Sequence, residues 1–432
     1  MVRCCNAMSA DSGLRKAVTL RYAVALYMSS VLGSGVLVLP GLAAQKAGPA
    51  SLIAWVTLSI ASYPMAYTFA TLSARSPESG GVYAFAKESF GQRVATSTSW
   101  LFVVWFATGA PAVTVIAASY LGFAFHLERA VAYVVAGLII FGAFGINYRG
   151  IEVSGKVQLA VVAAIVVLLL TTVLTSIHLV RLENFQPFFP NGLIPIGISA
   201  ALIFWSYLGY ENVSNVAEEF KNPKRDFQRS IVLSVALIGV LYLSVAVVTV
   251  GTRAYEAGGS VAPFAAILSN AVGPYAAVGT AILAAIIIFG TVNAYTTGMS
   301  RVIYMAAKQG AFPKALSRVH SETGVPHRSL GLISGLSLIS LVLFYFLDVD
   351  LPTALLIPSG AAILVYVVGS ASGIKLFRKE KKTTLFPWVS LGISLIMLPF
   401  VGIPLVVSLA VAAAGLFYQR KLPVRQESNS NN

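Results

Sequence analysis

The chain has 432 residues, of which 57% are hydrophobic and only 11% are charged. A soluble protein needs more polar residues to cover its surface, since about 25% of the residues in an ordinary soluble domain are charged. The composition therefore excludes a soluble globular protein and predicts one that lies in a membrane. The net charge is +14, so the positions of the basic residues have to be explained as well.

Apolar stretches of about 20 residues recur from Leu20 to Tyr418, and each is long enough to cross a bilayer core of ~30 Å. Because the first stretch continues to Gly41 and others follow it, we expect no cleaved signal peptide. Cys4 and Cys5 lie in the polar N-terminal tail and offer neither a disulfide framework nor metal-ligand spacing. The stretches predict an all-α polytopic membrane protein with about twelve transmembrane helices, at 18–45, 50–74, 94–122, 130–148, 155–178, 194–218, 229–252, 274–305, 329–347, 352–376, 385–401 and 403–419.

The basic residues predict the orientation of these helices. With the N-terminus in the cytosol, all of the 30 lysines and arginines fall on the cytosolic side except Lys46, Arg129, Arg181 and Arg253. This is the asymmetry of the positive-inside rule. The positive charge is then explained by topology, with some attraction to anionic lipid, and no nucleic-acid partner is expected. We expect a multi-pass protein of a prokaryotic cell (cytoplasmic) membrane with both termini in the cytosol.

Two of the predicted helices differ from the rest. The first carries Gly33, Ser34 and Gly35 at its middle, and the sixth carries a polar, glycine-bearing segment at 206–212. Each opens a run of five helices, and interrupted helices at matching positions of two halves indicate a transporter with inverted repeats. The predicted divisions are a tail at 1–17, a first repeat at 18–178, a second repeat at 194–376, two further helices within 385–419, and a tail at 420–432.

The Gly33-Ser34-Gly35 sequence weakens the first helix, because each glycine costs ~1 kcal/mol relative to alanine in a helix interior. Backbone N–H groups freed there, together with the dipole of the following half-helix, favour an anion such as a carboxylate. The carbonyl groups of Ser30 and Val31 suit an ammonium group. The alternative is a packing interface in which small residues let two helices approach closely. The second break, in helix six, favours a binding site.

Glu211 is the one acidic residue predicted to lie deep within a span. An acidic side chain at the bilayer centre costs about 2.5–3.5 kcal/mol on insertion scales and marks ion pathways or proton relays. Three roles stay open for it: a structural hydrogen bond to a neighbouring helix, proton coupling, and direct contact with substrate.

Aromatic side chains cluster at the break in helix six, at Trp205, Tyr207 and Tyr210. They can gate a substrate or fill space against lipid, and Trp205, directly before the break, is predicted to be the gate. Helix eight holds the most polar stretch of any span, at 291–300, and Tyr295 is predicted to reach the cavity. The neighbouring hydroxyl groups have the alternative of bonding their own helix backbone.

Sequence patterns typical of enzymes are absent. No glycine-rich phosphate loop ends in Lys-Ser or Lys-Thr, so ATP-driven pumping is not expected. The four histidines lie in predicted loops without ligand spacing, and no Ser/His/Asp set falls at a common depth. We expect no enzyme activity, no cofactor and no metal site.

Four motifs, in chain order, resemble those of the amino acid–polyamine–organocation (APC) transporters. They are Leu32-Gly33-Ser34-Gly35-Val36 followed by Pro40, then Glu78-Ser79-Gly80-Gly81-Val82-Tyr83, then Phe204-Trp205-Ser206-Tyr207-Leu208-Gly209-Tyr210-Glu211 running on to Asp226, and finally Ser300-Arg301 through Gln309-Gly310-Ala311-Phe312-Pro313.

The resemblance implies a LeuT-like fold of five plus five inverted helices with two extra ones, and alternating access around an α-amino acid. It implies that the Gly-Ser-Gly backbone takes the carboxylate, and that carbonyl groups before it and on helix six take the amine. The residues assigned to the substrate in this way are Val31, Gly33, Ser34, Gly35, Trp205, Ser206, Leu208 and Tyr295. Glu211 aligns with an acidic residue implicated in the proton response of arginine/agmatine antiporters.

Within the family, the helix-six segment and Gly109-Ala110-Pro111-Ala112 in helix three look most like bacterial exporters of methionine and branched-chain amino acids. Some proton-coupled relatives carry a lysine midway along helix five, whereas residues Leu159 to Leu170 contain no charge here. A built-in ammonium group in place of a sodium ion is therefore not expected.

The leading interpretation is a secondary active transporter of neutral L-amino acids, in which helices 1, 2, 6 and 7 rock against the others. Only Glu211 offers a charge in the predicted cavity, which disfavours cationic and dicarboxylic substrates. Proton symport, proton-driven export and exchange stay open, as does the oligomeric state. The competing classes are a transporter-like amino acid sensor, which usually has a long soluble extension, and an ion channel, which needs charged rings or carbonyl filters.

Overall fold

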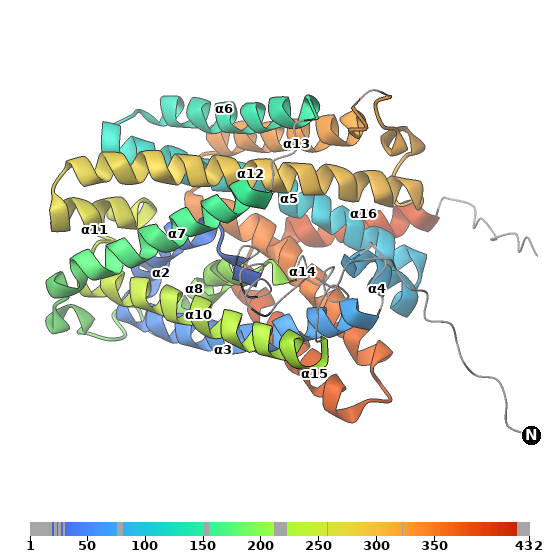
Figure 1. Ribbon diagram of the computed structural model, residues 1–432, viewed down its shortest axis with the longest axis horizontal. Helices are drawn as coiled ribbons and strands as arrows, with labels where there is room; N and C mark the ends of the chain where they lie inside the picture. The colour runs from blue at the N-terminus through green and yellow to red at the C-terminus, as the bar shows by residue number, and fades with distance from the viewer. Residues whose placement is uncertain are drawn as a thin grey trace, which may run out of the picture.

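The structure, a computed structural model, describes residues 20, 24, 27–28, 31–75, 81–150, 155–210, 223–256, 258–321 and 323–420. Within these residues every regular element is a helix. The long helices lie side by side, inclined to one another, along the longest axis of the molecule (Figure 1). The predicted all-α architecture is therefore confirmed for the described part of the chain.

The helices have the following bounds. The α-helices are α2 (Leu39–Ala47), α3 (Ser51–Arg75), α4 (Gly81–Phe90), α5 (Gln92–Phe125), α6 (Arg129–Tyr148), α7 (Gly155–Ser176), α8 (Ile194–Phe204), α10 (Pro223–Gly251), α11 (Pro263–Val272), α12 (Tyr275–Lys308), α13 (His327–Phe346), α14 (Leu351–Leu376), α15 (Lys381–Val401) and α16 (Leu405–Arg420). The short 3-10 helices are η1 (Ser34–Leu37), η2 (Gly48–Ala50), η3 (Ile177–Leu179), η4 (Leu182–Phe185), η5 (Trp205–Tyr207), η7 (Gly259–Val261) and η8 (Lys314–Ser317).

By length and composition, nine helices of the described residues can cross a membrane, one of them formed by α2 and α3 together. Three shorter apolar helices accompany them, at Ile194–Tyr207, Pro263–Val272 and Leu405–Gln419. α5 and α12 have 34 residues each. At ~1.5 Å per residue they are about 50 Å long, so they tilt within a core of ~30 Å or project beyond it. The count of twelve spans stays a prediction.

Two helices occupy connections in which the sequence predicts none. α4 has ten residues and buries Val82, Tyr83 and Phe85 against α5 and α14. α11 also has ten residues and packs against α7 and α12. An apolar stretch this short gives no transmembrane signal. Hydropathy alone therefore assigns both segments to loops.

The surface of the molecule is apolar, and its interior contains many small hydroxyl groups. Large apolar side chains such as Leu138, Phe141 and Leu174 are more than half exposed, which suits contact with lipid. Inside, Thr68 and Thr172 donate to carbonyl groups four residues earlier in their own helices. Small side chains and internally bonded hydroxyl groups let helices pack closely where no water is present.

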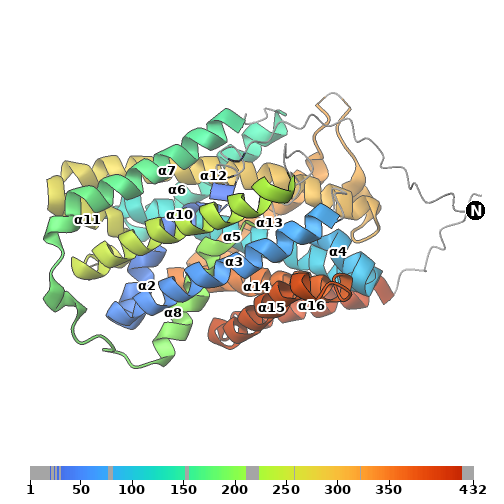
Figure 2. The same ribbon diagram turned by 60° about the horizontal axis from the view of Figure 1, so that its bottom comes forward.

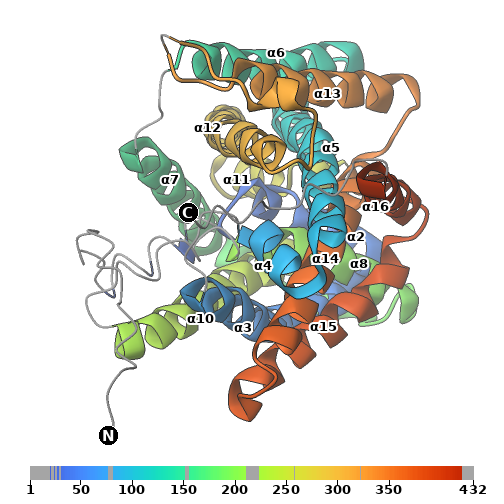
Figure 3. The same cartoon turned by 90° about the vertical axis from the view of Figure 1, so that its right-hand side faces the viewer.

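The helices form two groups that pack mainly within themselves. α2, α3, α8 and α10 form one group, and α5, α6, α12 and α13 form the other. Seen along the long axis, α6 and α13 lie side by side on one edge, while α3 and α10 lie near the opposite edge (Figure 3). Figure 2 shows α3 and α10 next to one another along their length. α14 contacts helices of both groups and so lies between them.

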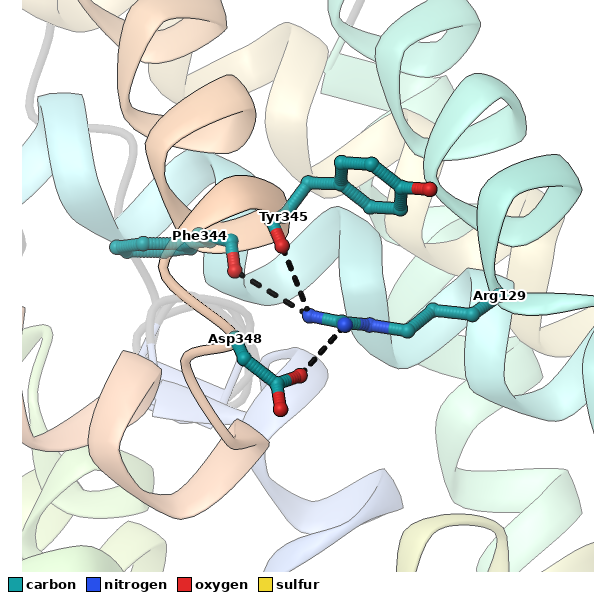
Figure 4. A network of polar contacts seen from close by, with 4 residues as sticks. All are labelled: Arg129, Phe344, Tyr345 and Asp348. Carbon is teal, nitrogen blue, oxygen red and sulfur yellow. Dashed lines mark hydrogen bonds and ion pairs between the residues drawn. The ribbon is translucent and has the colours of Figure 1, made fainter.

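Arg129, at the start of α6, joins this helix to the C-terminal end of α13 (Figure 4). Its guanidinium group forms an ion pair with Asp348 at 2.5 Å and donates a hydrogen bond to the carbonyl oxygen of Tyr345 at 3.2 Å. It also lies 5.4 Å from the ring centre of Tyr133 and 5.2 Å from that of Tyr345. Arg129 is one of the four basic residues predicted outside the cytosol, and these contacts hold two helices of the second group together at that end.

Candidate functional site

The first helix is interrupted where the sequence predicts it. Val31 still has helical conformation, whereas Leu32 and Gly33 do not. The N–H group of Gly33 turns back to the carbonyl oxygen of Val31 at 2.8 Å. The backbone of Gly33 is extended, with φ −112° and ψ −167°. One turn of 3-10 helix, η1, follows before α2 begins, and Ser34 and Gly35 are its first two residues.

The sixth helix is interrupted as well. α8 ends at Phe204, and the single 3-10 turn η5 carries Trp205, Ser206 and Tyr207. Leu208 is extended, with φ −80° and ψ 152°. Gly209 follows with φ +122°, a value that side chains disfavour and glycine tolerates. The glycine at this position is therefore what lets the chain leave the helical path.

The two interruptions touch each other. A Cβ atom added to Gly35 would lie 2.7 Å from Cδ1 of Trp205 and 2.8 Å from Oγ of Ser206. Only a residue without a side chain fits at position 35. The Ser206 hydroxyl group is buried and has no hydrogen-bond partner among the described residues. A buried hydroxyl group without a partner is uncommon in proteins, and this one lies where the two broken helices meet.

Two tyrosine hydroxyl groups hold the carbonyl groups of the first break. The hydroxyl oxygen of Tyr242 in α10 lies 3.2 Å from the carbonyl oxygen of Val31 and 3.1 Å from that of Ser206. Its single hydrogen is therefore shared between a carbonyl group of each break. Tyr120 of α5 donates to the carbonyl oxygen of Leu37 at 2.5 Å. Helix ends leave carbonyl groups without an intrahelical partner. These side chains supply partners from the two different helix groups.

The Trp205 indole extends from η5 to α5. A Cβ atom added to Gly109 would lie 2.8 Å from Cη2 of Trp205 and 3.5 Å from Cβ of Pro358 in α14. The ring therefore has Gly35 near its pyrrole side and Gly109 near its far end. Phe204 and Ser206 on either side of Trp205 are buried, whereas Trp205 keeps partial exposure.

Tyr207 and the aromatic residues around it pack within the first helix group. Its hydroxyl group is 2.6 Å from that of Ser59 in α3. Its ring centre lies 6.3 Å from that of Trp55 and 5.3 Å from that of Tyr242. Tyr210 is fully buried, with its ring centre 6.5 Å from that of Tyr27. Tyr207 and Tyr210 thus fill space inside this group of helices rather than against lipid.

The polar stretch of helix eight divides between two surroundings. Tyr295 is 41% exposed and lies in α12, a helix that contacts η1. Asn293 is buried, and its side-chain oxygen accepts a hydrogen bond from Asn147 of α6 at 2.9 Å. Thr297 donates to the side-chain oxygen of Asn147. Tyr295 therefore belongs to a helix that borders the first break, while Asn293 and Thr297 join two helices of the second group.

The structure brings four of the predicted site residues into direct or shared contact. Val31, Gly35, Trp205 and Ser206 meet through direct contacts or through Tyr242. Their sequence neighbours in the two breaks are Gly33, Ser34 and Leu208. Tyr295 lies in α12, which contacts η1. Glu211 lies outside the described residues.

Three contact residues are not identifiable from the sequence alone. Tyr242, Tyr120 and Gly109 each lie in long apolar helices. A tyrosine at membrane depth, whose hydroxyl group needs a partner, is a weak signal that could have pointed to the first two. For Gly109 the only signal is its place in the Gly-Ala-Pro-Ala sequence of helix three.

Comparison with known proteins shows the family of the chain. Residues 19–431 match the amino acid permease family. The chain is 30% identical over 410 residues to the uncharacterized amino acid permease YecA of Bacillus subtilis, covering 94% of this chain and 96% of that protein. It is 30% identical over 375 residues to the L-methionine/branched-chain amino acid exporter YjeH of Escherichia coli, covering 85% and 88%. It is 28% identical over 348 residues to the branched-chain amino acid permease BcaP of Bacillus subtilis, covering 74% and 73%.

An all-helical membrane protein in which two interrupted helices meet has the architecture of a transporter for small solutes. The chain belongs to the amino acid permease family, and so to the APC superfamily that its four motifs resemble. It is a multi-pass membrane protein of a family of amino acid transporters.

Proposed function

We propose that the protein is a secondary active transporter of neutral L-amino acids, and that the substrate binds where the two interrupted helices meet. The observation that carries the proposal is the contact between Gly35, Trp205 and Ser206, at which the buried Ser206 hydroxyl group lacks a partner among the described residues. A polar group left unpaired in a water-poor interior is suited to a ligand that supplies the missing hydrogen bond.

The α-amino and α-carboxyl groups of the substrate bind to backbone. The segment from Gly33 to Gly35 takes the carboxylate, because the N–H groups at the start of a helical segment favour an anion. The carbonyl groups of Val31, Ser206 and Leu208 accept hydrogen bonds from the ammonium group. Tyr242 is hydrogen-bonded to two of these carbonyl groups and keeps them in position to bind the ammonium group.

Among the described residues, the side chains that contact one another at the breaks are uncharged. Trp205, Ser206 and Tyr242 provide apolar surface and hydroxyl groups, and the helix that carries Tyr295 contacts η1. A charged substrate side chain would lose its hydration there without gaining a counter-ion from these side chains, which is costly. The site therefore favours neutral substrates such as alanine, leucine and methionine over lysine and glutamate.

The inverted-repeat arrangement is part of the proposal, with predicted helices 1 to 5 repeated as 6 to 10. Its support is that corresponding helices pack together in four pairs: α2 with α8, α3 with α10, α5 with α12, and α6 with α13. The group formed by α2, α3, α8 and α10 comprises predicted helices 1, 2, 6 and 7, the part proposed to rock against the rest. Alternating access needs two such bodies around one fixed site.

The second candidate function is export of methionine and branched-chain amino acids. It is favoured by the 30% identity with the exporter YjeH over 85% of this chain. Export and uptake use the same site and differ in coupling, for which Glu211 is the proton-binding candidate. In either case we place the protein in the cell membrane with both termini in the cytosol, because of the distribution of its lysines and arginines.

Purified protein in proteoliposomes tests the proposal. Preloaded vesicles are given labelled leucine, methionine, alanine, lysine or glutamate, with and without a proton gradient of either direction. Saturable counterflow of the neutral amino acids is the expected result. Strong lysine or glutamate transport with none of the neutral substrates would overturn it, and binding without counterflow would favour the sensor instead.

A further inference from the structure

The side chain of Trp205 lies between two glycines from different elements, η1 and α5. Gly35 of η1 lies near Cδ1 of the indole, and Gly109 of α5 lies near Cη2 and Cζ3. At either glycine an added Cβ atom would come within 2.8 Å of the ring. The indole is rigid and has two side-chain torsions, so it cannot yield at one end as a flexible chain can. Its position is therefore set by the absence of side chains at positions 35 and 109.

Among the described residues, the Trp205 indole is the one group that leaves no room for a side chain at position 109. Gly109 is buried within α5, and its closest neighbours besides Trp205 lie in Pro358, at 3.5 Å from an added Cβ atom. That distance is ordinary van der Waals contact, whereas 2.8 Å to Cη2 is not. A side chain at position 109 is thus excluded by the indole, and the backbone conformation does not require glycine there, since Gly109 has helical conformation.

We propose that Gly109 determines the size of the substrate side chain that the site accepts, by allowing the Trp205 indole to withdraw against α5. The proposal rests on the function proposed above, in which the substrate backbone binds at Gly33–Gly35 and Ser206. Because Trp205 directly precedes Ser206 and its ring lies beside Gly35, the indole forms one wall of the proposed site. Moving the ring away from α5 moves it toward the substrate.

The test is a set of four proteins: wild type, Gly109→Ala, Trp205→Phe and the double variant. Gly298→Ala in α12 is the matched control, because an added Cβ atom there meets nothing within 4 Å. Each protein is reconstituted in proteoliposomes, and unlabelled alanine, leucine, methionine and phenylalanine compete with labelled alanine. Thermal unfolding of each protein in detergent is measured alongside.

In Gly109→Ala the added methyl group displaces the indole toward the site. Competition by leucine, methionine and phenylalanine is expected to weaken at least about tenfold relative to alanine, the scale for one methylene group in an apolar pocket. The phenyl ring introduced by Trp205→Phe lacks the outer ring atoms that reach Gly109. The double variant is therefore expected to match Trp205→Phe, which itself favours larger substrates. If Gly109→Ala does not fold but the double variant does, the clash between the added methyl group and the indole is supported. The competition profile of Trp205→Phe against that of wild type then tests the size preference.

Two results would overturn the inference. One is a Gly109→Ala competition profile equal to that of wild type and Gly298→Ala. The other is an equal loss of activity or stability when Gly109→Ala is introduced into wild type and into Trp205→Phe, which would mean that the methyl group acts without the indole. A wild-type protein that no neutral amino acid occupies would instead refute the proposed function, so the two failures are told apart.

Discussion

The hydroxyl group of Tyr242 lies 3.2 Å from the carbonyl oxygen of Val31, the residue at which the first helix stops. The same hydroxyl group is 3.1 Å from the carbonyl oxygen of Ser206 in η5. One side chain of α10 therefore sets the relative position of the two breaks. It does so through the backbone groups that we propose for binding the substrate ammonium.

Replacing Tyr242 by phenylalanine should weaken substrate binding with little effect on folding of the rest of the protein. The change removes the hydroxyl group that links the carbonyl oxygens of Val31 and Ser206, so these groups are no longer held in position for the ammonium group. Two hydrogen bonds of about 0.5–1.5 kcal/mol each are lost, and an apparent affinity loss of about tenfold is expected. The measurement is saturation binding or counterflow of labelled alanine.

Tyr207→Phe is the matched control for Tyr242→Phe. It removes a buried hydroxyl group from the same aromatic cluster, but its partner is Ser59 and not a carbonyl group of either break. Equal affinity loss in the two variants would show that Tyr242 acts through general packing and not through the breaks.

Replacing Gly209 by alanine should disturb the sixth-helix break. Gly209 has φ +122°, and forcing a side chain into such a conformation costs about 1–3 kcal/mol. The segment is expected to relax toward a helix, which lowers transport while the protein remains in the membrane. Gly298→Ala, in helical conformation with open space around it, is the control. Wild-type kinetics for Gly209→Ala would contradict a functional break.

Replacing Arg129 by alanine should lower stability more than replacing Asp348 by asparagine. The ion pair is largely exposed, with side-chain exposures of 46% and 85%, and such pairs contribute up to about 1 kcal/mol. Arg129 also bonds the Tyr345 carbonyl group and lies over two rings, so its loss is expected to cost about 1–2 kcal/mol.

Thermal unfolding in detergent at low and high salt measures this difference. Raised salt should weaken the effect of the Asp348 variant and leave most of the Arg129 effect, because only the exposed pair is screened. Equal destabilisation by the two variants would show that the contacts of Arg129 with the Tyr345 carbonyl group and the two rings contribute nothing beyond the ion pair.

The asparagines of α6 and α12 should be energetically coupled. Asn147→Ala removes the donor to Asn293 and the acceptor for Thr297. A double-mutant cycle of Asn147→Ala and Asn293→Ala is expected to give an interaction energy of about 0.5–3 kcal/mol. Ser359→Ala, whose hydroxyl group bonds its own helix at Leu355, is the control. Additive effects of the two asparagine substitutions would refute the coupling.

Replacing Glu211 by glutamine tests the coupling role assigned to that residue by its place in the sequence. A carboxyl group at membrane depth marks a proton pathway, so the variant is expected to lose the pH dependence of transport while substrate binding is retained. Counterflow and binding are measured over the same pH range. An unchanged pH profile would remove Glu211 from proton coupling.

Most of the helices follow from hydropathy. The predicted spans at 130–148 and 352–376 correspond closely to α6 and α14, because about 20 apolar residues are what a bilayer core requires. The two breaks also follow from local sequence, since Gly33, Gly35 and Gly209 weaken or leave a helix by their own conformational freedom. α4 and α11 do not follow from the sequence, because helices of ten residues depend on tertiary packing for their stability.

Contacts between helices are harder to predict in this protein than in a soluble one. In a soluble helix an apolar stripe identifies the buried face, whereas here the faces toward lipid and toward protein are both apolar. Leu138 and Ile140 lie two residues apart in α6, and the first is 63% exposed while the second is 3% exposed. Nothing in their chemistry distinguishes them.

The sequence by itself determined the class of protein, its membrane helices, its motifs and the places where two helices break, because these depend on hydropathy, charge and local backbone freedom. Only the tertiary structure decided which side chains meet at those breaks. Tyr242 and Val31 are 211 positions apart, and Gly109 meets Trp205 from another helix. Such contacts depend on the rotation and tilt of packed helices. The sequence does not predict these, because the helix faces toward lipid and toward protein are both apolar.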